Sequence, residues 1–278
     1  MSSEGREIRF ERLRPAQLNA EMARCPLVFV PVGPLEYHGP HMPVGTDPLV
    51  ATRCALEACG RLGKGVVFPT VFWGTERERP AWMLESLGLD PRAWVVGMDF
   101  PTAQWKSHYA AEHIFALVVA TQIEALIAGG YRVIMLVNGH GATNHIQTLM
   151  RLSAHYTAVT SCTVAGIEPI ADEPPAGGYG GHADIGETAV LLHNARAWPE
   201  SGNLVDLGAL PPRSVPIHYR DFSVVDSAGF SRTPDPQKVV HDDPRDATVE
   251  IGKRVFEGMV ADCMKSTRAA LASKGLDG

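Results

Sequence analysis

Apolar runs of strand length alternate along the chain with longer segments of helical pattern. The strand-like runs cover 26–33, 65–74, 132–141 and 163–170. Helical patterns follow them at 47–63, 105–128, 143–156 and 186–195. Because strands that are apolar throughout are typical of parallel sheets covered on both faces, we expect an α/β fold with a mostly parallel central sheet.

The first helical segment carries clear boundary signals. Asp47 is placed to cap its first turn, Pro48 takes the first helical position, and Gly63 ends it. Residues 199–246 are instead rich in Pro, Gly, Asp and Ser, which predicts an irregular excursion or an arm that contacts another subunit. Since no linker divides the pattern, residues 1–278 are expected to form a single domain.

The composition excludes several classes of protein. The 278 residues include 25 Lys and Arg against 31 Asp and Glu, a formal net charge of −6, so we expect no partner nucleic acid and no membrane. A hydrophobic share of 45% is enough for a buried core, which excludes a disordered chain, and no apolar run is long enough to span a membrane. The charged N-terminal stretch and five scattered cysteines favour a cytoplasmic protein over an exported one.

Polar residues cluster after the predicted strands, where ligands bind in open parallel sheets. The first cluster contains Glu36, His38 and His41, and Asp47 follows it. In an extended segment Glu36 and His38 share a face, and a carboxylate and an imidazole suit Zn²⁺, Mn²⁺ or Fe²⁺. On these residues alone, a helix cap at Asp47 and histidines in a polar loop explain the cluster equally well.

Two further clusters follow the third and fourth predicted strands. The sequence N-G-H-G at 138–141 places His140 between glycines, where the backbone can turn sharply. His182 follows two glycines, and Glu187 lies about one turn into the next helical segment. Taken singly, a polar turn and a helix N-terminus with a favourable acidic residue are the alternative interpretations. Because all three clusters follow strands, we expect one shared site.

Three sequence motifs, in this order and spacing, resemble the signatures of the creatininase family of metal-dependent amidohydrolases. The motifs are PVGPLEYHGPHMPVGTD, VNGHGATN and GGHADIGETA, and they span residues 31 to 189. The resemblance implies a three-layer α/β/α sandwich, two divalent metal ions (Zn²⁺, Mn²⁺ or Fe²⁺) and a homo-oligomer, a hexamer in many members. It further implies that Glu36 and His140 bind one ion, that His38 binds the other, and that Asp47 bridges them.

The sequence departs from the family pattern in two places. In the creatinine-hydrolysing members a glutamate that binds the second ion follows the N-G-H motif, and the matching residue here is Ala142. Glu187 is the carboxylate that we expect to bind the second ion instead. The segment 73–89 also lacks the short H-x-x-F-P-G-T-like stretch that is common in the family. Both departures predict a substrate other than creatinine.

The expected reaction is hydrolysis of a C–N bond other than a peptide bond. Two divalent ions carry +4 and Glu36, Asp47 and Glu187 supply −3, so one metal-bound hydroxide neutralises the site. We expect this hydroxide to attack the carbonyl carbon of a cyclic amide, a formamide or a small amide. His182 and Glu187 are the expected catalytic residues, and His182 protonates the leaving nitrogen. A lactone or peptide hydrolase with the same ions, and a metal-binding homologue without activity, are the alternatives.

Residues other than the expected metal ligands are candidates for the wall of a pocket that takes a small-molecule substrate. The candidate substrate-binding residues are His41, Trp73, Arg77, Trp105 and His108. An arginine at such a place suits a carboxylate or a phosphate through paired hydrogen bonds. The alternatives are a solvated charged loop around Arg77 and a structural role for His41.

Overall fold

A parallel four-stranded sheet forms the centre of the protein, in a computed structural model that describes residues 6–167, 180–199, 202–226 and 239–276. The order of the strands across the sheet is β2–β1–β3–β4, and every neighbouring pair is parallel. The strands are β1 (Leu27–Val32), β2 (Val66–Val67), β3 (Val133–Asn138) and β4 (Thr163–Ile167). The carboxyl ends of β1 and β3 lie side by side, because Val32 is the register partner of Asn138.

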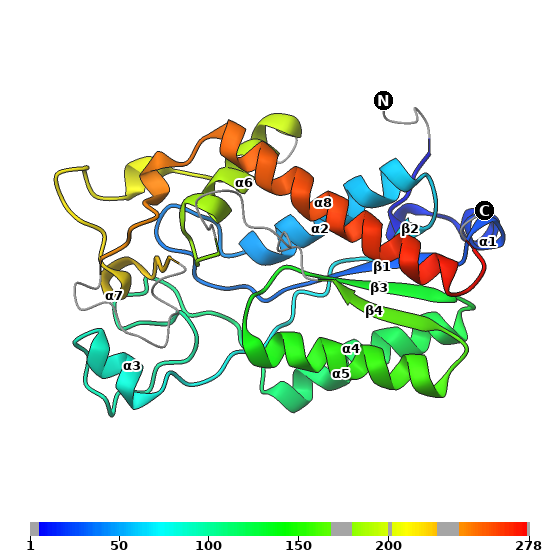
Figure 1. The fold of residues 1–278 in the computed structure, drawn as a ribbon, viewed down its shortest axis with the longest axis horizontal. Helices are drawn as coiled ribbons and strands as arrows, with labels where there is room; N and C mark the ends of the chain where they lie inside the picture. The colour runs from blue at the N-terminus through cyan, green and yellow to red at the C-terminus, as the bar shows by residue number, and fades with distance from the viewer. Residues whose placement is uncertain (1–5, 168–179, 200–201, 227–238, 277–278) are drawn as a thin grey trace.

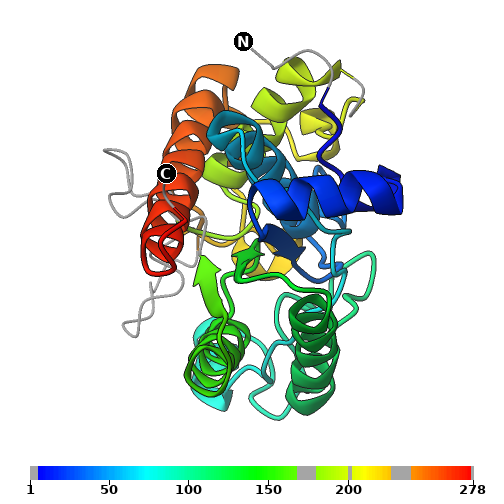
Figure 2. The same ribbon diagram turned by 90° about the vertical axis from the view of Figure 1, so that its right-hand side faces the viewer.

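Helices cover both faces of this sheet (Figures 1 and 2). One face carries α2 (Thr46–Leu62), α6 (Ile185–Ala197) and α8 (Val249–Ala272), and the other carries α4 (Glu112–Ala128) and α5 (Thr143–Val159). The shorter helices are α1 (Pro15–Arg24), α3 (Ala81–Ser86) and α7 (Tyr219–Phe222). The predicted three-layer α/β/α sandwich is confirmed. Figure 1 shows α3 and α7 beyond one end of the sheet, opposite to the end where both chain termini lie.

The continuous apolar pattern of β1 reflects burial on both faces. Leu27 and Phe29 belong to the core that lies under α2 and α8, whereas Val28, Val30 and Val32 belong to the core under α4. Each of these five side chains is at most 1% exposed. A strand of this kind gains from burying every residue, so its apolar residues do not alternate with polar ones.

Two predicted elements differ from the observed ones. The run 65–74 forms only the two-residue strand β2, followed by a single bridge between Val71 and Val32. The helix expected at 105–128 begins at Glu112, because the preceding residues hydrogen-bond to other segments. The His108 amide donates to the Leu35 carbonyl, and the Ala110 amide donates to the Gly74 carbonyl. These bonds hold residues 107–110 extended beside the end of β1. Residues 168–170 of the fourth predicted strand lie outside the described residues.

The segment expected as an irregular excursion packs onto the same chain where it is described. The Asp206 amide donates to the His41 carbonyl at 2.9 Å, and the Ser223 hydroxyl donates to the Met98 carbonyl at 2.9 Å. Val225 pairs with His182 in an antiparallel bridge. These parts of 199–246 therefore support the loops beyond the sheet, and a role as a subunit-contact arm stays a prediction. Within the described residues, no helix combines the length and the apolar character that crossing a membrane requires.

Candidate metal centre

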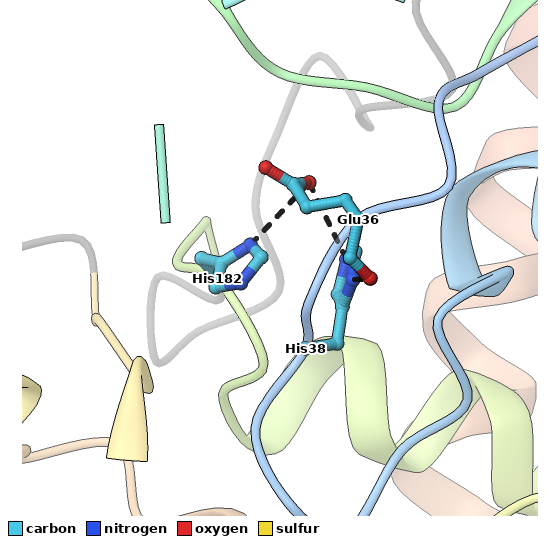
Figure 3. A group of neighbouring side chains, drawn as sticks. All are labelled: Glu36, His38 and His182. Carbon is cyan, nitrogen blue, oxygen red and sulfur yellow. Dashed lines mark hydrogen bonds and ion pairs between the residues drawn. The ribbon is translucent and has the colours of Figure 1, made fainter. Parts of the chain in front are cut away.

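Six acidic and histidine side chains meet beyond the carboxyl ends of β1 and β3. They are Glu36, His38, Asp47, His140, His182 and Glu187. The first two follow β1, Asp47 lies in the first turn of α2, His140 follows β3, and the last two lie at the start of α6. Figure 3 shows the rings of His38 and His182 turned toward the carboxylate of Glu36. The structure thus brings together all the residues that the three motifs single out as metal ligands or catalytic groups.

Asp47 lies at the middle of this cluster. Its Oδ1 is 3.0 Å from Nε2 of His38, and its Oδ2 is 3.0 Å from Nδ1 of His140. The Glu36 Oε2 atom lies 3.2 Å from the same His140 nitrogen, and the Glu187 Oε2 atom lies 3.6 Å from the His38 nitrogen. Two groups of three potential ligands therefore share Asp47 and use a different oxygen of it, and a third group combines Glu36, His38 and His182.

Close backbone approaches place Asp47 there. The structure corrects the expectation that Asp47 caps α2, because the cap residue is Gly45 and Asp47 lies inside the first turn. A Cβ atom at Gly139 would collide with the Asp47 carbonyl, and one at Gly33 would lie 2.9 Å from the Asp47 Cβ. The two glycines let the start of α2 press against the ends of both strands, so the carboxylate faces the strand ends.

The His182 loop is held in an unusual backbone conformation. Ala183 has a φ of 51°, in the left-handed region that residues with a side chain rarely adopt. Its amide donates to Glu187 Oε2 at 2.6 Å, and Asp184 caps α6 by accepting from the amides of Gly186 and Glu187. The loop therefore directs the Glu187 carboxylate back toward His38.

The charges of the cluster shift the pKa values of its members. Burial alone would raise the pKa of Glu36, but the imidazoles around it, His140 first, hold that pKa well below its usual range. Burial opposes the charge on His38, yet Asp47 and the two glutamates raise the pKa of the ring to about 10. Burial raises the pKa of Glu187 to about 8, although His38 lowers it. The crowded carboxylates thus attract positive charge.

The tautomers of two histidines fit a metal ion. Nδ1 of His38 lies 3.1 Å from the Glu36 carbonyl, and Nε2 of His182 lies 2.8 Å from the Tyr37 carbonyl. A carbonyl only accepts, so each of these nitrogens carries a hydrogen, and the other nitrogen of a neutral ring turns a lone pair toward a carboxylate. Apart from the ion pairs given above, neither Nε2 of His38 nor Oδ2 of Asp47 makes a hydrogen bond within the described residues. A cation in the group of His38, Asp47 and Glu187 would satisfy the first atom, and one in the group of Glu36, Asp47 and His140 would satisfy the second.

A cavity of about 650 Å³ opens onto this cluster. Glu36, Asp47, His140, His182 and Glu187 lie in its wall. The remaining wall combines charged residues from 76–79 with apolar side chains from α2, α3, α6 and α8. The Glu187 side chain is 32% exposed, whereas Glu36 and His38 are at most 2% exposed, so Glu187 is the carboxylate most open to the cavity.

The five candidate substrate-binding residues are scattered. Arg77 lines the cavity, and its side chain is 57% exposed. The other four do not occur among the described residues that line the cavity. His41 is buried behind the cluster, with Nε2 3.0 Å from the hydroxyl of Thr188. Trp73 is exposed, and Trp105 packs on the ring of His108 with their centroids 4.7 Å apart.

The motif analysis missed Tyr109, whose hydroxyl donates to Oε1 of Glu36. Burial, together with the charge of Glu36, raises the pKa of Tyr109, so the phenol stays protonated as a donor. Tyr109 lies in a segment that the sequence pattern assigned to a helix, and no spacing relates it to Glu36. Only the path of the chain between Gly97 and α4 brings it to the site.

Comparison with known proteins agrees with the fold. The family model Creatininase, described as creatinine amidohydrolase, matches residues 11–267. The chain belongs to the creatininase family. The predicted membership is therefore confirmed, and the protein is a metal-dependent amidohydrolase of this family whose substrate need not be creatinine.

Individual members of the family share most of this chain's length. A mycofactocin precursor peptide peptidase from Mycobacterium tuberculosis is 26% identical over 260 residues, which cover 86% of this chain and 84% of that protein. The structure titled creatininase Mn superposes with a TM-score of 0.64 at 19% identity, and covers 95% of this chain and 98% of its own. A creatininase variant of Zn–Zn type has a TM-score of 0.63 at 20% identity, with the same coverage. At such identities the two structures show a shared fold.

Proposed function

We propose that this protein hydrolyses an amide bond at a centre of two divalent ions, Zn²⁺, Mn²⁺ or Fe²⁺. One ion is bound by Glu36, Asp47 and His140, and the other by His38, Asp47 and Glu187. The observation that carries this proposal is the position of Asp47, whose two oxygens lie 3.0 Å from nitrogens of two different histidines. A carboxylate whose two oxygens face two ligand groups would suit a hydrolytic site that holds two ions close together.

The ions, when bound, supply Lewis-acid activation of water and of the substrate carbonyl. The chain itself moves the proton. Because Nε2 of His182 donates to the Tyr37 carbonyl, Nδ1 is the atom that accepts a proton from the attacking water and returns it to the leaving nitrogen. Burial, together with His38, lowers the pKa of His182 to about 4, so at neutral pH the ring starts as a base rather than as the poised acid expected from an unperturbed histidine.

For the substrate we favour an amide within a peptide or a comparably extended molecule. The cavity of about 650 Å³ far exceeds what a small cyclic amide fills, and its wall includes apolar side chains from four helices. Relatives that match 86% of the chain by sequence are named as mycofactocin precursor peptide peptidases, which supports a peptide. Arg77, on the cavity wall, would pair with a carboxylate of such a substrate.

A non-peptide C–N bond, in a cyclic amide, a formamide or a small amide, is the second candidate. The family model carries the description creatinine amidohydrolase, and the metal ligands do not depend on the size of the substrate. Ala142, where creatinine-hydrolysing members carry a glutamate, argues against creatinine itself. Lactone hydrolysis would use the same groups.

Location and assembly complete the proposal. All five cysteines are buried and free, which suits the reducing cytoplasm. The family resemblance supports a homo-oligomer, a hexamer, built from single-domain subunits of residues 1–278.

The first test is metal content per chain, measured by elemental mass spectrometry on protein purified without a histidine tag. Two ions per chain would support the proposed centre, and a value near one would remove Glu187 from the ligand set. A value near zero that Zn²⁺ and Mn²⁺ do not raise would favour a homologue without catalysis. The loaded enzyme is then offered peptides, cyclic amides, formamides and lactones at equal concentration. Turnover of small amides with no peptide cleaved would replace the first candidate by the second.

A further inference from the structure

Glu36 uses its two carboxylate oxygens for different purposes. Its Oε2 atom lies 3.2 Å from Nδ1 of His140, closer than the 3.8 Å that separate it from Nε2 of His38 and from Nδ1 of His182, so it faces the group of Glu36, Asp47 and His140 first. Its Oε1 atom accepts the hydrogen bond from the Tyr109 hydroxyl. Because Glu36 is only 2% exposed, loss of that bond would leave a buried carboxylate oxygen without its partner.

The bonding of the Tyr109 hydroxyl determines the direction of its proton. The Met98 amide donates to the hydroxyl oxygen at 3.2 Å. An amide can only donate, so the hydroxyl oxygen accepts there; the Glu36 carboxylate can only accept, so the single hydrogen of Tyr109 points at Glu36. The hydroxyl therefore acts as a donor of fixed direction.

The turn at 97–98 is built around this hydroxyl. Gly97 has a φ of 56°, and a Cβ atom at this position would collide with the hydroxyl of Tyr109. Arg79 holds the turn, because its Nε donates to the Gly97 carbonyl at 2.7 Å. Arg79 is itself paired with Glu76 at 3.1 Å. The segment 76–98, which carries none of the family motifs, is thus connected to Glu36 through one phenol.

The Tyr109 ring also faces His140, the second residue of the same ligand group. The two rings are stacked, with their centroids 6.2 Å apart and an angle of 30° between their planes. Tyr109 therefore contacts two ligands of one proposed ion. Among the described interactions of its hydroxyl, none involves His38 or Glu187, the ligands proposed for the other ion.

We propose that Tyr109 is a positioning residue that holds Glu36 in its metal-binding orientation, and that it acts on the ion bound by Glu36, Asp47 and His140 only. This inference rests on the two-ion centre proposed above. The hydrogen bond restricts rotation of the Glu36 carboxylate before an ion binds. Binding through Oε2 would therefore cost less side-chain entropy than binding by a mobile carboxylate. A tyrosine that served only to fill space would not distinguish between the two ions.

The test compares the metal affinity of Tyr109→Phe with that of the native chain, by competition for Zn²⁺ against a chromogenic chelator. Removal of the hydroxyl is expected to weaken one of the two binding steps about 10- to 100-fold and to leave the other within about threefold. The matched control is Tyr131→Phe, because Tyr131 is also buried and its hydroxyl has no hydrogen-bond partner within the described residues. Both steps of the control should match the native chain. Equal affinities in Tyr109→Phe and the native chain, or an equal loss at both steps, would overturn the proposal.

A second variant, at Gly97, disrupts the same hydrogen bond between Tyr109 and Glu36. Gly97→Ala would displace the hydroxyl of Tyr109 and should weaken the same binding step. In the double variant with Tyr109→Phe, the loss should be no greater than that of the larger single variant, because both changes remove one interaction. Losses that multiply would contradict the shared mechanism. Failure of the native chain to bind Zn²⁺ would instead reject the two-ion centre, so the two proposals fail by different results.

Discussion

The loops at the strand ends and the wall of the cavity are built in different ways. Glu36 and His140 follow the neighbouring strands β1 and β3, whose last residues are register partners. Both side chains are at most 5% exposed. The wall at 76–83 runs into the short helix α3, and its side chains include Arg77 at 57% and Trp82 at 50% exposure. The proposed ligands thus lie in buried loops at the strand ends, and the proposed substrate contacts lie on a more exposed segment.

This contrast separates residues that can be found from sequence from those that cannot. A residue that directly follows a buried strand has a position determined by the sheet, so Glu36 and His140 were predicted to share a site. A residue in an exposed connecting segment has no such reference. Of the candidates taken from 73–108, Arg77 lines the cavity and Trp73 does not occur in the described lining. Mutations should reproduce this contrast: we expect large losses of kcat/KM for residues at the strand ends and small losses for residues of the cavity wall.

His140→Ala should have the largest effect. Loss of this ligand removes one ion and its activation of water, so we expect kcat/KM to fall by about 10⁴-fold or more while the chain stays folded. Metal content and circular dichroism check both parts. His155→Ala, an exposed histidine of α5, is the control and should keep its metal. Full activity in His140→Ala would reject the site.

Glu187→Gln should release the second ion. The amide keeps the shape but loses the charge that pairs with His38, so metal content should fall from two ions to one and kcat/KM by about 10³-fold. The control is Glu250→Gln, at an exposed carboxylate in the first turn of α8. Retention of two ions in Glu187→Gln would show that Glu187 is not a ligand.

His182→Ala should lower turnover by about 10² to 10⁴-fold, the range of general acid–base catalysis, with the metal content unchanged. The reason is that Nδ1 transfers the proton and the ring is not needed to bind an ion. Elemental analysis separates proton transfer from metal binding, because loss of metal in His182→Ala would make His182 a ligand. Metal binding is the alternative to test because Nδ1 of His182 lies 3.8 Å from Oε2 of Glu36.

Arg77→Ala should have the smallest effect and should act on the wall alone. We expect kcat/KM for a substrate that carries a carboxylate to fall about three- to tenfold, through KM, because an exposed ion pair contributes little. For the same substrate with its carboxylate amidated, Arg77→Ala should have the same kcat/KM as the native chain. Trp73→Ala should change KM less than Arg77→Ala, and the reverse order would place the substrate elsewhere on the wall.

The boundaries of the helices show what local pattern can and cannot predict. The pattern around α2 and α5 located both helices within a few residues. The expected helix at 105–128 begins at Glu112, since hydrogen bonds from His108 and Ala110 to distant carbonyls compete with helical ones. Of the two roles expected for Asp47, the helix cap is wrong because the cap residue is Gly45, and the bridging of two ions stays a prediction. Its carboxylate faces the strand ends because Gly33 and Gly139 admit the backbone of α2 so closely.

By itself, the sequence determined the parallel sheet, the order of its elements and the six polar residues beyond its strands. Those features follow from local periodicity and from the rule that parallel strands end at one edge. Tertiary structure decided which oxygen of Asp47 faces which histidine, that Tyr109 holds Glu36, and that Val225 supports the loop of His182. Apart from the pair of Asp47 and His38, these contacts join residues 43 to 93 positions apart. No repeating pattern along a chain records such distances, because they depend on how loops pack and not on the period of any one element.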